Sequence, residues 1–167
     1  PEVWGRIVGE ELGLHSVQIV ADLINPFWPE EYINQLIRRI QEASKRYDFN
    51  VDSIFTSAFT RVNHLMNPDE DARQFWLDWF KKLLLIGSRL GAATGGSHFG
   101  ILTFDTLEHE SKRKQVVEAG IKAWQELSFY AKEIGYDAII FEPMSVPREF
   151  ANTIADTKEC LAAVNAN

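Results

Sequence analysis

The chain has 167 residues, of which 46% are hydrophobic and 25% are charged, a mixture typical of a globular protein rather than a disordered one. Its net charge of −7 and the absence of a run of Lys and Arg argue against a nucleic-acid partner. No apolar stretch approaches the ~20 residues that cross a bilayer. With a single cysteine, Cys160, and no signal-peptide pattern at the N-terminus, we expect a cytoplasmic protein without a membrane partner.

The first third of the chain predicts a helix, a strand and a second helix. Residues 3–12 have one apolar face at helical spacing, and Gly13 is placed to end this helix. The β-branched residues of segment 16–23 favour a strand. After the loop 25–29, apolar residues recur at helical spacing, and Pro29 is expected as the first helical residue.

A second unit of strand and helix follows. Residues 51–55 predict the strand, and the polar segment 56–67 predicts the loop. Pro68 and the acidic residues after it open the next helix, because negative charge is favourable at a helix N-terminus. The expected buried face of this helix consists of Phe75, Trp79, Leu83 and Ile86.

The remaining sequence repeats the pattern twice more. A third strand is expected within residues 92–104, followed by a helix over 111–134 that Gly135 ends. Residues 138–141 predict a fourth strand. Thr153 and Asp156 resemble a capping box at the start of a last helix.

A strand followed by a helix, four times over, predicts an α/β fold with a parallel sheet and right-handed crossovers. No linker or low-complexity segment interrupts the pattern, so residues 1–167 are expected to form a single domain. Four strands make an open sheet and cannot close a barrel of eight strands.

Glu142 is the first candidate for a functional residue, because it directly follows the apolar strand 138–141. In parallel β/α proteins the carboxyl ends of the strands carry the chemistry. A carboxylate there suits a hard divalent cation or proton transfer beside a carbonyl group. One Glu cannot form a metal site alone, because several ligands must converge. The alternative is a structural Glu that caps the following turn or pairs with Arg148.

Four further residues are candidates on weaker grounds. Glu149 is either a second site carboxylate or an acidic residue that stabilises a helix start. His98, between glycines, either contacts a ligand or is satisfied by the backbone. His64 lies with Arg61 in a polar loop. This loop either binds a ligand or is solvated. Trp28, in the loop after the first strand, is placed to line a pocket.

Four segments resemble strand-end segments of the xylose-isomerase-like sugar isomerase and epimerase family. The resemblance covers nearly the whole chain and is strongest over residues 138–165. The segments are SVQIVADLINPFWP, VNHLMNPDEDAR, GGSHFG and FEPMSVPREFANTIADT. The resemblance implies a (β/α)8 TIM barrel, of which this chain would hold about strands two to five as an incomplete barrel with flanking helices.

The resemblance also implies site residues and a cofactor. Glu142 matches the family's first metal-binding Glu, which also takes part in moving the proton, and Glu149 matches a substrate-contacting Glu. We take both residues as catalytic candidates. His64 and His98 fall where members contact the sugar. We add Arg148 and Trp28 as substrate-binding candidates. The implied cofactor is a divalent cation such as Mn²⁺, Mg²⁺ or Co²⁺.

The function expected from this resemblance is a metal-dependent sugar isomerase or epimerase that works through an enediolate. We expect a small unphosphorylated sugar, because no basic phosphate cradle is visible. The family's first strand and last three strands would lie outside these residues, so the chain alone is expected to be inactive, and its open edges favour a homo-oligomer. The alternatives are an endonuclease-IV-like metal phosphodiesterase, which the charge of −7 disfavours, and a non-catalytic half-barrel assembly module.

Overall fold

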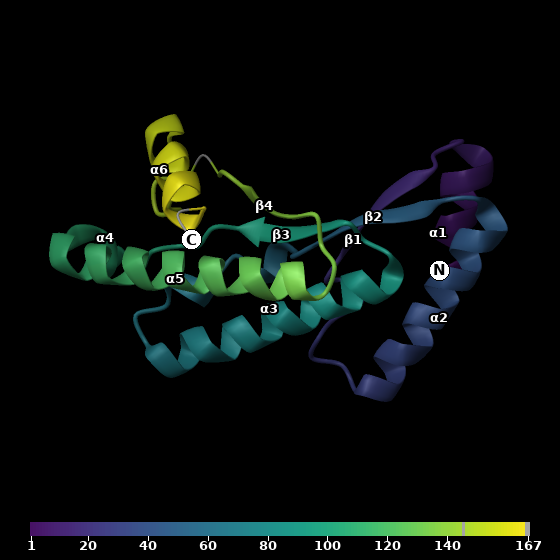
Figure 1. Ribbon diagram of the computed structural model, residues 1–167, viewed down its shortest axis with the longest axis horizontal. Coiled ribbons are helices and arrows are strands. Elements are labelled where there is room, and N and C mark those ends of the chain that lie inside the picture. Colours follow the sequence, from purple (N-terminus) through teal and green to yellow (C-terminus); the bar gives the residue numbers. More distant parts are fainter. Residues whose placement is uncertain (145, 166–167) are drawn as a thin grey trace.

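The computed structural model describes residues 1–144 and 146–165 (Figure 1). Its four strands form one parallel sheet in the order β1-β2-β3-β4. The strands are β1 (Ser16–Val20), β2 (Asn50–Phe55), β3 (Thr94–His98) and β4 (Ala138–Glu142). This arrangement confirms the predicted α/β fold with about four parallel strands.

Helices connect the strands and flank the sheet. The longer ones are α2 (Glu30–Tyr47), α3 (Glu70–Leu90), α5 (Glu110–Glu133) and α6 (Ile154–Val164). The short ones are α1 (Glu2–Arg6), the π-helical turn η1 (Ile7–Glu11), the 3₁₀ turns η2 (Ala58–Thr60) and η3 (His64–Met66), and α4 (Phe104–Glu108). In Figure 1, α3 and α5 run side by side along the sheet, and α6 lies at the opposite end of the molecule from α1 and α2.

The helix ends follow local sequence chemistry. The Asp69 carboxylate accepts a hydrogen bond from the backbone N–H of Ala72 at 2.8 Å and caps α3. Gly91 ends α3 with a φ of 91°, a left-handed conformation that a residue with a Cβ rarely adopts. Pro29 was predicted one position too far into α2: its ψ of 140° makes it the residue before the helix, which begins at Glu30.

Two predicted elements are shorter in the structure, and one predicted core residue is exposed. The strand expected over 16–23 ends at Val20, because the chain then turns and the N–H of Leu23 donates to the Val20 carbonyl. The strand expected within 92–104 is limited to Thr94–His98. Phe75 is 54% exposed and stacks on Phe27 with 5.9 Å between the ring centroids, outside the core.

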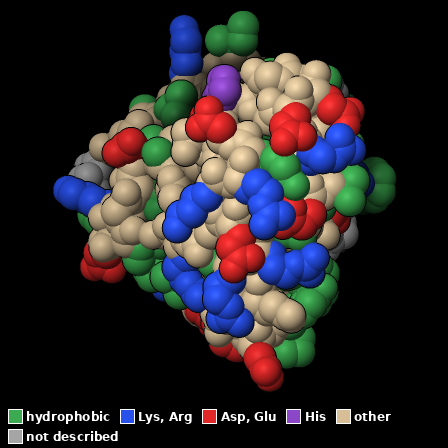
Figure 2. All heavy atoms as spheres, turned by 90° about the vertical axis from the view of Figure 1, so that its right-hand side faces the viewer, with side chains coloured by type: hydrophobic (Ala, Val, Ile, Leu, Met, Phe, Trp, Pro, Cys, Tyr) green, Lys and Arg blue, Asp and Glu red, His purple; other side chains and the backbone are tan. Residues whose placement is uncertain are grey.

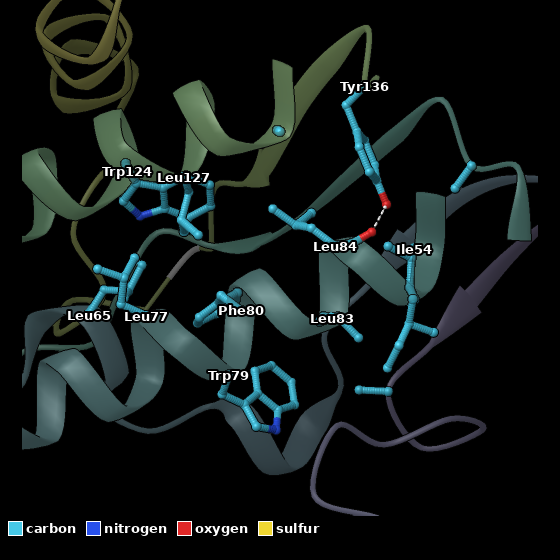
Figure 3. Packing of buried hydrophobic residues seen from close by; sticks show 14 of the residues in the cluster. Ile54, Leu65, Leu77, Trp79, Phe80, Leu83, Leu84, Trp124, Leu127 and Tyr136 are labelled. Carbon is cyan, nitrogen blue, oxygen red and sulfur yellow. Dashed lines mark hydrogen bonds between the residues drawn. The ribbon is translucent and has the colours of Figure 1, made fainter. Parts of the chain in front are cut away.

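The helix-facing side of the sheet forms the core. Ile54 of β2 and Gly95 of β3 lie against α3, where a Cβ on Gly95 would come within 2.6 Å of Leu84. Figure 3 shows Leu84 and Tyr136 meeting above Ile54, with the Tyr136 hydroxyl donating to the Leu84 carbonyl at 2.7 Å. This contact joins α3 to the loop that leads into β4.

The residues on the other face of the sheet can be identified from strand alternation, because successive side chains along a strand point to opposite faces. Ile54 faces the helices, so Phe55 faces away from them, and Phe55 is the register partner of Gly96. Gly96 in turn pairs with Ile140. A Cβ on Gly96 would lie 1.8 Å from the carbonyl oxygen of Ile140, so glycine is required for the spacing of β3 and β4.

Charges of both signs are interspersed on the face of the molecule shown in Figure 2. Arg46 pairs with Glu2 at 3.1 Å and links α2 to α1. Arg89 and Lys82 of α3 approach Glu30 at the start of α2 at 3.5 and 3.7 Å. Within residues 1–144 and 146–165, none of the helices is long and apolar enough to span a membrane.

Candidate functional site

Glu142 is the last residue of β4 and the register partner of His98, the last residue of β3. The preceding residue, Phe141, packs against Phe99 and Trp124 of the helical layer, with ring centroids 5.6 and 6.2 Å apart. Because neighbours on a strand point to opposite faces, Glu142 points away from the helices. Its side chain is exposed, and no ion pair or hydrogen bond of its carboxylate occurs in the described part of the chain.

Arg148 does not pair with Glu142, so this structural alternative for Glu142 is not observed. The Arg148 guanidinium donates to the carbonyl of Leu102 at 3.2 Å and lies 4.5 Å from the centre of the Phe104 ring. The backbone of Leu102 in turn donates to the Arg148 carbonyl. These contacts join the loop after β4 to the loop after β3, and they engage the guanidinium that was predicted to bind substrate.

Glu149 is buried, with 2% of its surface exposed. Its backbone forms an antiparallel bridge with Ile101, and α6 begins only at Ile154, so it is not a helix-start carboxylate. Its Oε1 atom has no hydrogen-bond partner among the described residues. Burial raises the pKa of Glu149 to about 7, the charge of Arg61 opposes this rise and the charge of Glu142 adds to it.

His64 and His98 form a buried pair in which the two Nε2 atoms are 2.8 Å apart. The backbone N–H of Leu65 donates to Nδ1 of His64 at 2.6 Å. Both ring nitrogens of His64 are therefore bonded within the protein, which leaves none for the sugar contact that was predicted. Burial lowers the pKa of both imidazoles, that of His98 to about 4, so both are neutral at pH 7.

Arg61 belongs to this cluster, and sequence reasoning treated it only as a neighbour of His64. Its positive charge lowers the pKa of both His98 and Glu149. The available signal was its position in the loop after β2, at the same edge of the sheet as Glu142. A second link at this edge is the hydrogen bond from the Thr56 hydroxyl to the Ser97 hydroxyl at 2.9 Å.

Trp28 has a packing role in the structure. Its ring lies 5.3 Å from that of Tyr32 in α2, and its side chain is partly buried against the core. These contacts do not test the expectation that Trp28 lines a pocket, which stays a prediction.

The residues present do not form a metal site by themselves. Within residues 1–144 and 146–165, no three side chains of His, Cys, Asp or Glu come together in a way that could hold a metal ion. Glu142 offers one exposed carboxylate at the edge of the sheet. A divalent cation needs several converging ligands, so Glu142 can be at most one member of such a set.

Comparison with known proteins agrees with this architecture. The chain is 34% identical over 149 residues to D-erythrulose 1-phosphate 3-epimerase from Brucella abortus (strain 2308), covering 89% of this chain and 48% of that enzyme. A scan against models of protein families finds no match.

Solved structures extend the likeness to the fold. A crystal structure of a candidate xylose isomerase from Rhodospirillum rubrum superposes with a TM-score of 0.93 at 22% identity, over 99% of this chain and 56% of that one. D-psicose 3-epimerase from Clostridium cellulolyticum, solved with D-tagatose, gives a TM-score of 0.75 at 17% identity, over 98% and 54%. A xylose-isomerase-like TIM-barrel protein from Mycobacterium smegmatis, in complex with magnesium, gives 0.64 at 15%, over 98% and 53%.

The chain spans about half the length of the curated relative and of these solved structures. Its β1-to-β4 sheet and flanking helices correspond to part of their fold, as the strand-end segments predicted. The chain thus has the fold of about half of a xylose-isomerase-like TIM barrel, and the resemblance to the sugar isomerases and epimerases of that family is confirmed.

Proposed function

We propose that this chain contributes the strand-end carboxylates of a sugar epimerase, which inverts a carbon centre beside the ketone of a small ketose. The carrying observation is the placement of Glu142. It ends β4 on the face turned away from the helices and has His98 as its register partner. The charge of Glu142 also raises the pKa of the buried Glu149, as expected of two carboxyl groups that belong to one site. The name of the curated relative, a 3-epimerase of a ketose phosphate, supports the reaction class.

In the proposed reaction the two carboxyl groups have different roles. The exposed carboxylate of Glu142 takes the proton from the carbon next to the carbonyl. The electron pair of the broken C–H bond forms a C=C bond to the carbonyl carbon, and the π pair of the carbonyl moves to its oxygen, which gives an enediolate. Glu149, with a pKa of about 7, is partly protonated at neutral pH and can donate a hydrogen bond to that oxygen. A proton from solvent water is then added to the opposite face of the carbon, and Glu142 releases the proton that it took to solvent, which completes the inversion.

A divalent cation is part of the proposal. Carboxylate oxygen is a favoured ligand of such ions, and one of the structural neighbours is a magnesium complex. When bound, the ion would polarise the carbonyl as a Lewis acid. Because the described residues offer only Glu142, the other ligands must come from elsewhere, and no step of the reaction above is assigned to the ion.

The substrate class is proposed as small ketoses with or without a phosphate group. The sequence favoured an unphosphorylated sugar, since it has no basic cradle. That inference depends on strands two to five only, whereas phosphate-binding loops in TIM barrels usually follow the seventh and eighth strands. The curated relative acts on a ketotetrose 1-phosphate. Both substrate types therefore belong in the assay.

The test is exchange of solvent deuterium into the carbon beside the ketone, followed by NMR in a protein that includes this chain. With D-erythrulose 1-phosphate or an unphosphorylated ketose, and with Mn²⁺, Mg²⁺ or Co²⁺ added, we expect exchange at that carbon. Glu142→Gln should lower its rate by about 10²- to 10⁴-fold. Exchange at the wild-type rate in Glu142→Gln would remove Glu142 from the reaction.

We also propose a cytoplasmic homo-oligomer. The edge strands β1 and β4 carry unpaired backbone groups on their outer sides in the described structure, and such edges favour association. Size-exclusion chromatography with light scattering measures the oligomeric state directly, and a monomer over the full concentration range would contradict the proposed homo-oligomer.

A further inference from the structure

The imidazoles of His64 and His98 meet end to end in the interior, with their Nε2 atoms 2.8 Å apart. A hydrogen bond between two ring nitrogens needs a proton on one and a free lone pair on the other. The remaining nitrogen of His64 decides which. The backbone N–H of Leu65 donates to Nδ1 of His64 at 2.6 Å, and a backbone amide can only donate. Nδ1 of His64 therefore carries no proton.

The protons of both rings follow from this one contact. His64 must carry its proton on Nε2 and donate it to Nε2 of His98, so His98 must carry its own proton on Nδ1. The Ser97 hydroxyl lies 3.4 Å from that Nδ1. A second proton on His98 would face the Nε2–H of His64, and a second proton on His64 would face the N–H of Leu65, so the arrangement disfavours the imidazolium form of either ring.

The pair also fixes the backbone of the loop after β2. The ring of His98 accepts from His64, and the backbone of Val62 in the same loop raises the pKa of His98, so both residues of this loop act on the ring. His64 has a φ of +29°, a conformation that residues with a Cβ rarely adopt. Its ring is held edge-on by Phe80, with 5.4 Å between the centroids. The strained position is thus held by contacts on several sides.

We propose that His64 is a positioning residue: it fixes His98 as the neutral Nδ1–H tautomer and thereby holds the loop 61–65 over the carboxyl end of β3. The catalytic role of this arrangement rests on the proposed function. There, the fixed loop keeps Arg61 in position to act on Glu149. It also keeps an uncharged ring at the register position beside Glu142. His64 itself touches no substrate, because both of its nitrogens are bonded within the protein.

The test is the tautomer of His98, read from long-range ¹H–¹⁵N NMR spectra of the imidazole nitrogens. The sequence has four histidines, so His64→Phe and His98→Asn variants assign the signals. In the wild-type protein we expect an unprotonated Nε2 on His98 and an unprotonated Nδ1 on His64. An Nε2–H tautomer on His98 in the wild-type protein would by itself overturn the proposal.

Two variants separate positioning from simple packing. His64→Phe keeps an aromatic ring against Phe80 but removes the donor, and His98 should then take up the Nε2–H tautomer that imidazole favours in water. His64→Gln retains an amide N–H at a similar reach and should restore the Nδ1–H tautomer. Loss of the Nδ1–H tautomer of His98 in His64→Phe, with its recovery in His64→Gln, supports the proposal. An unchanged tautomer in a folded His64→Phe protein overturns it.

The activity assay adds an independent readout. In the deuterium-exchange assay, kcat should fall about tenfold or more in His64→Phe, because misplaced site residues lose rate steeply, and it should recover in His64→Gln. Equal kcat values in the wild type and His64→Phe would contradict a positioning role. A wild-type protein that exchanges no deuterium would refute the proposed function, while the tautomer result would still decide the role of His64.

Discussion

His98 and Glu142 are register partners at the carboxyl ends of β3 and β4, on the face of the sheet turned away from α3 and α5. Their proximity depends on the spacing of the two strands. Two residues earlier on each strand, Gly96 pairs with Ile140. The absence of a side chain at Gly96 therefore controls how closely the candidate site residues approach each other.

Gly96→Ala should separate β3 from β4. The new Cβ would lie 1.8 Å from the carbonyl oxygen of Ile140, a backbone atom that cannot move without displacing the strand. Overpacking of this kind costs about 1–3 kcal/mol and sometimes more, and we expect a loss of about 3 kcal/mol in the free energy of unfolding. Chemical denaturation followed by circular dichroism measures it.

Gly120→Ala is the matched control for Gly96→Ala. Its Cβ would lie 3.1 Å from Cγ of Met66, the middle of a flexible side chain, and Gly120 is within helix α5. Replacing a helical glycine by alanine gains roughly 0.5–1 kcal/mol, which offsets the small displacement of Met66. We expect stability within about 1 kcal/mol of the wild type. Equal stability of the two variants would show that the β3–β4 spacing tolerates a side chain.

Glu149 should make folding stability depend on pH. Its pKa rises from the ordinary 4.5 to about 7 in the folded protein, so the folded state binds the proton more tightly than the unfolded state. The resulting stabilisation is complete below pH 4.5 and is lost as the pH rises through 7. At 1.36 kcal/mol per pKa unit, the loss amounts to about 3 kcal/mol. Denaturation curves at pH values from 4 to 8 measure it.

Glu149→Gln isolates this contribution from that of His98. The pKa of His98 falls from 6.5 to about 4, so its contribution has the opposite sign: it is present above pH 6.5 and is lost as the pH falls through 4. The two effects oppose each other between pH 4.5 and 6.5. Without the Glu149 carboxyl, stability should fall more steeply toward acid than in the wild type. Parallel pH profiles of the two proteins would contradict the raised pKa.

The order of strands and helices could be predicted because each boundary has a local chemical cause. Thr153 caps α6 by accepting from the N–H of Asp156 at 3.1 Å, as its sequence pattern indicated. The exposure of Phe75 could not be predicted, because helical spacing does not reveal where a helix extends beyond its sheet. Its contact with Phe27 joins residues far apart in the sequence.

The candidate site was predictable in position and less so in its contacts. The end of an apolar strand located Glu142, and its orientation follows from alternation along β4. The hydrogen bond between His64 and His98 could not be predicted, since it joins the loops of two different strands and depends on a rare backbone conformation at His64. The influence of Arg61 on Glu149 likewise requires knowledge of which loops meet.

Tyr136→Phe tests the link between α3 and the loop before β4. The Tyr136 hydroxyl donates to the Leu84 carbonyl at 2.7 Å in the buried core (Figure 3). Removing one such bond without creating a cavity should lower the free energy of unfolding by about 1 kcal/mol. Tyr32→Phe at an exposed position should change it by less than about 0.5 kcal/mol. Equal losses in both variants would show that the buried bond adds nothing.

Arg61→Met should raise the pKa of Glu149 above its wild-type value of about 7. The charge of Arg61 lowers this pKa and opposes the effects of burial and of Glu142, so removing the charge leaves those two effects unopposed. Arg61→Lys is the control that keeps a positive charge, and its midpoint should remain close to that of the wild type. The pKa of Glu149 in all three proteins can be measured from the pH dependence of the ¹³C NMR shift of its carboxyl carbon. A midpoint that does not move in Arg61→Met would show that the guanidinium lies too far from the carboxylate to influence it.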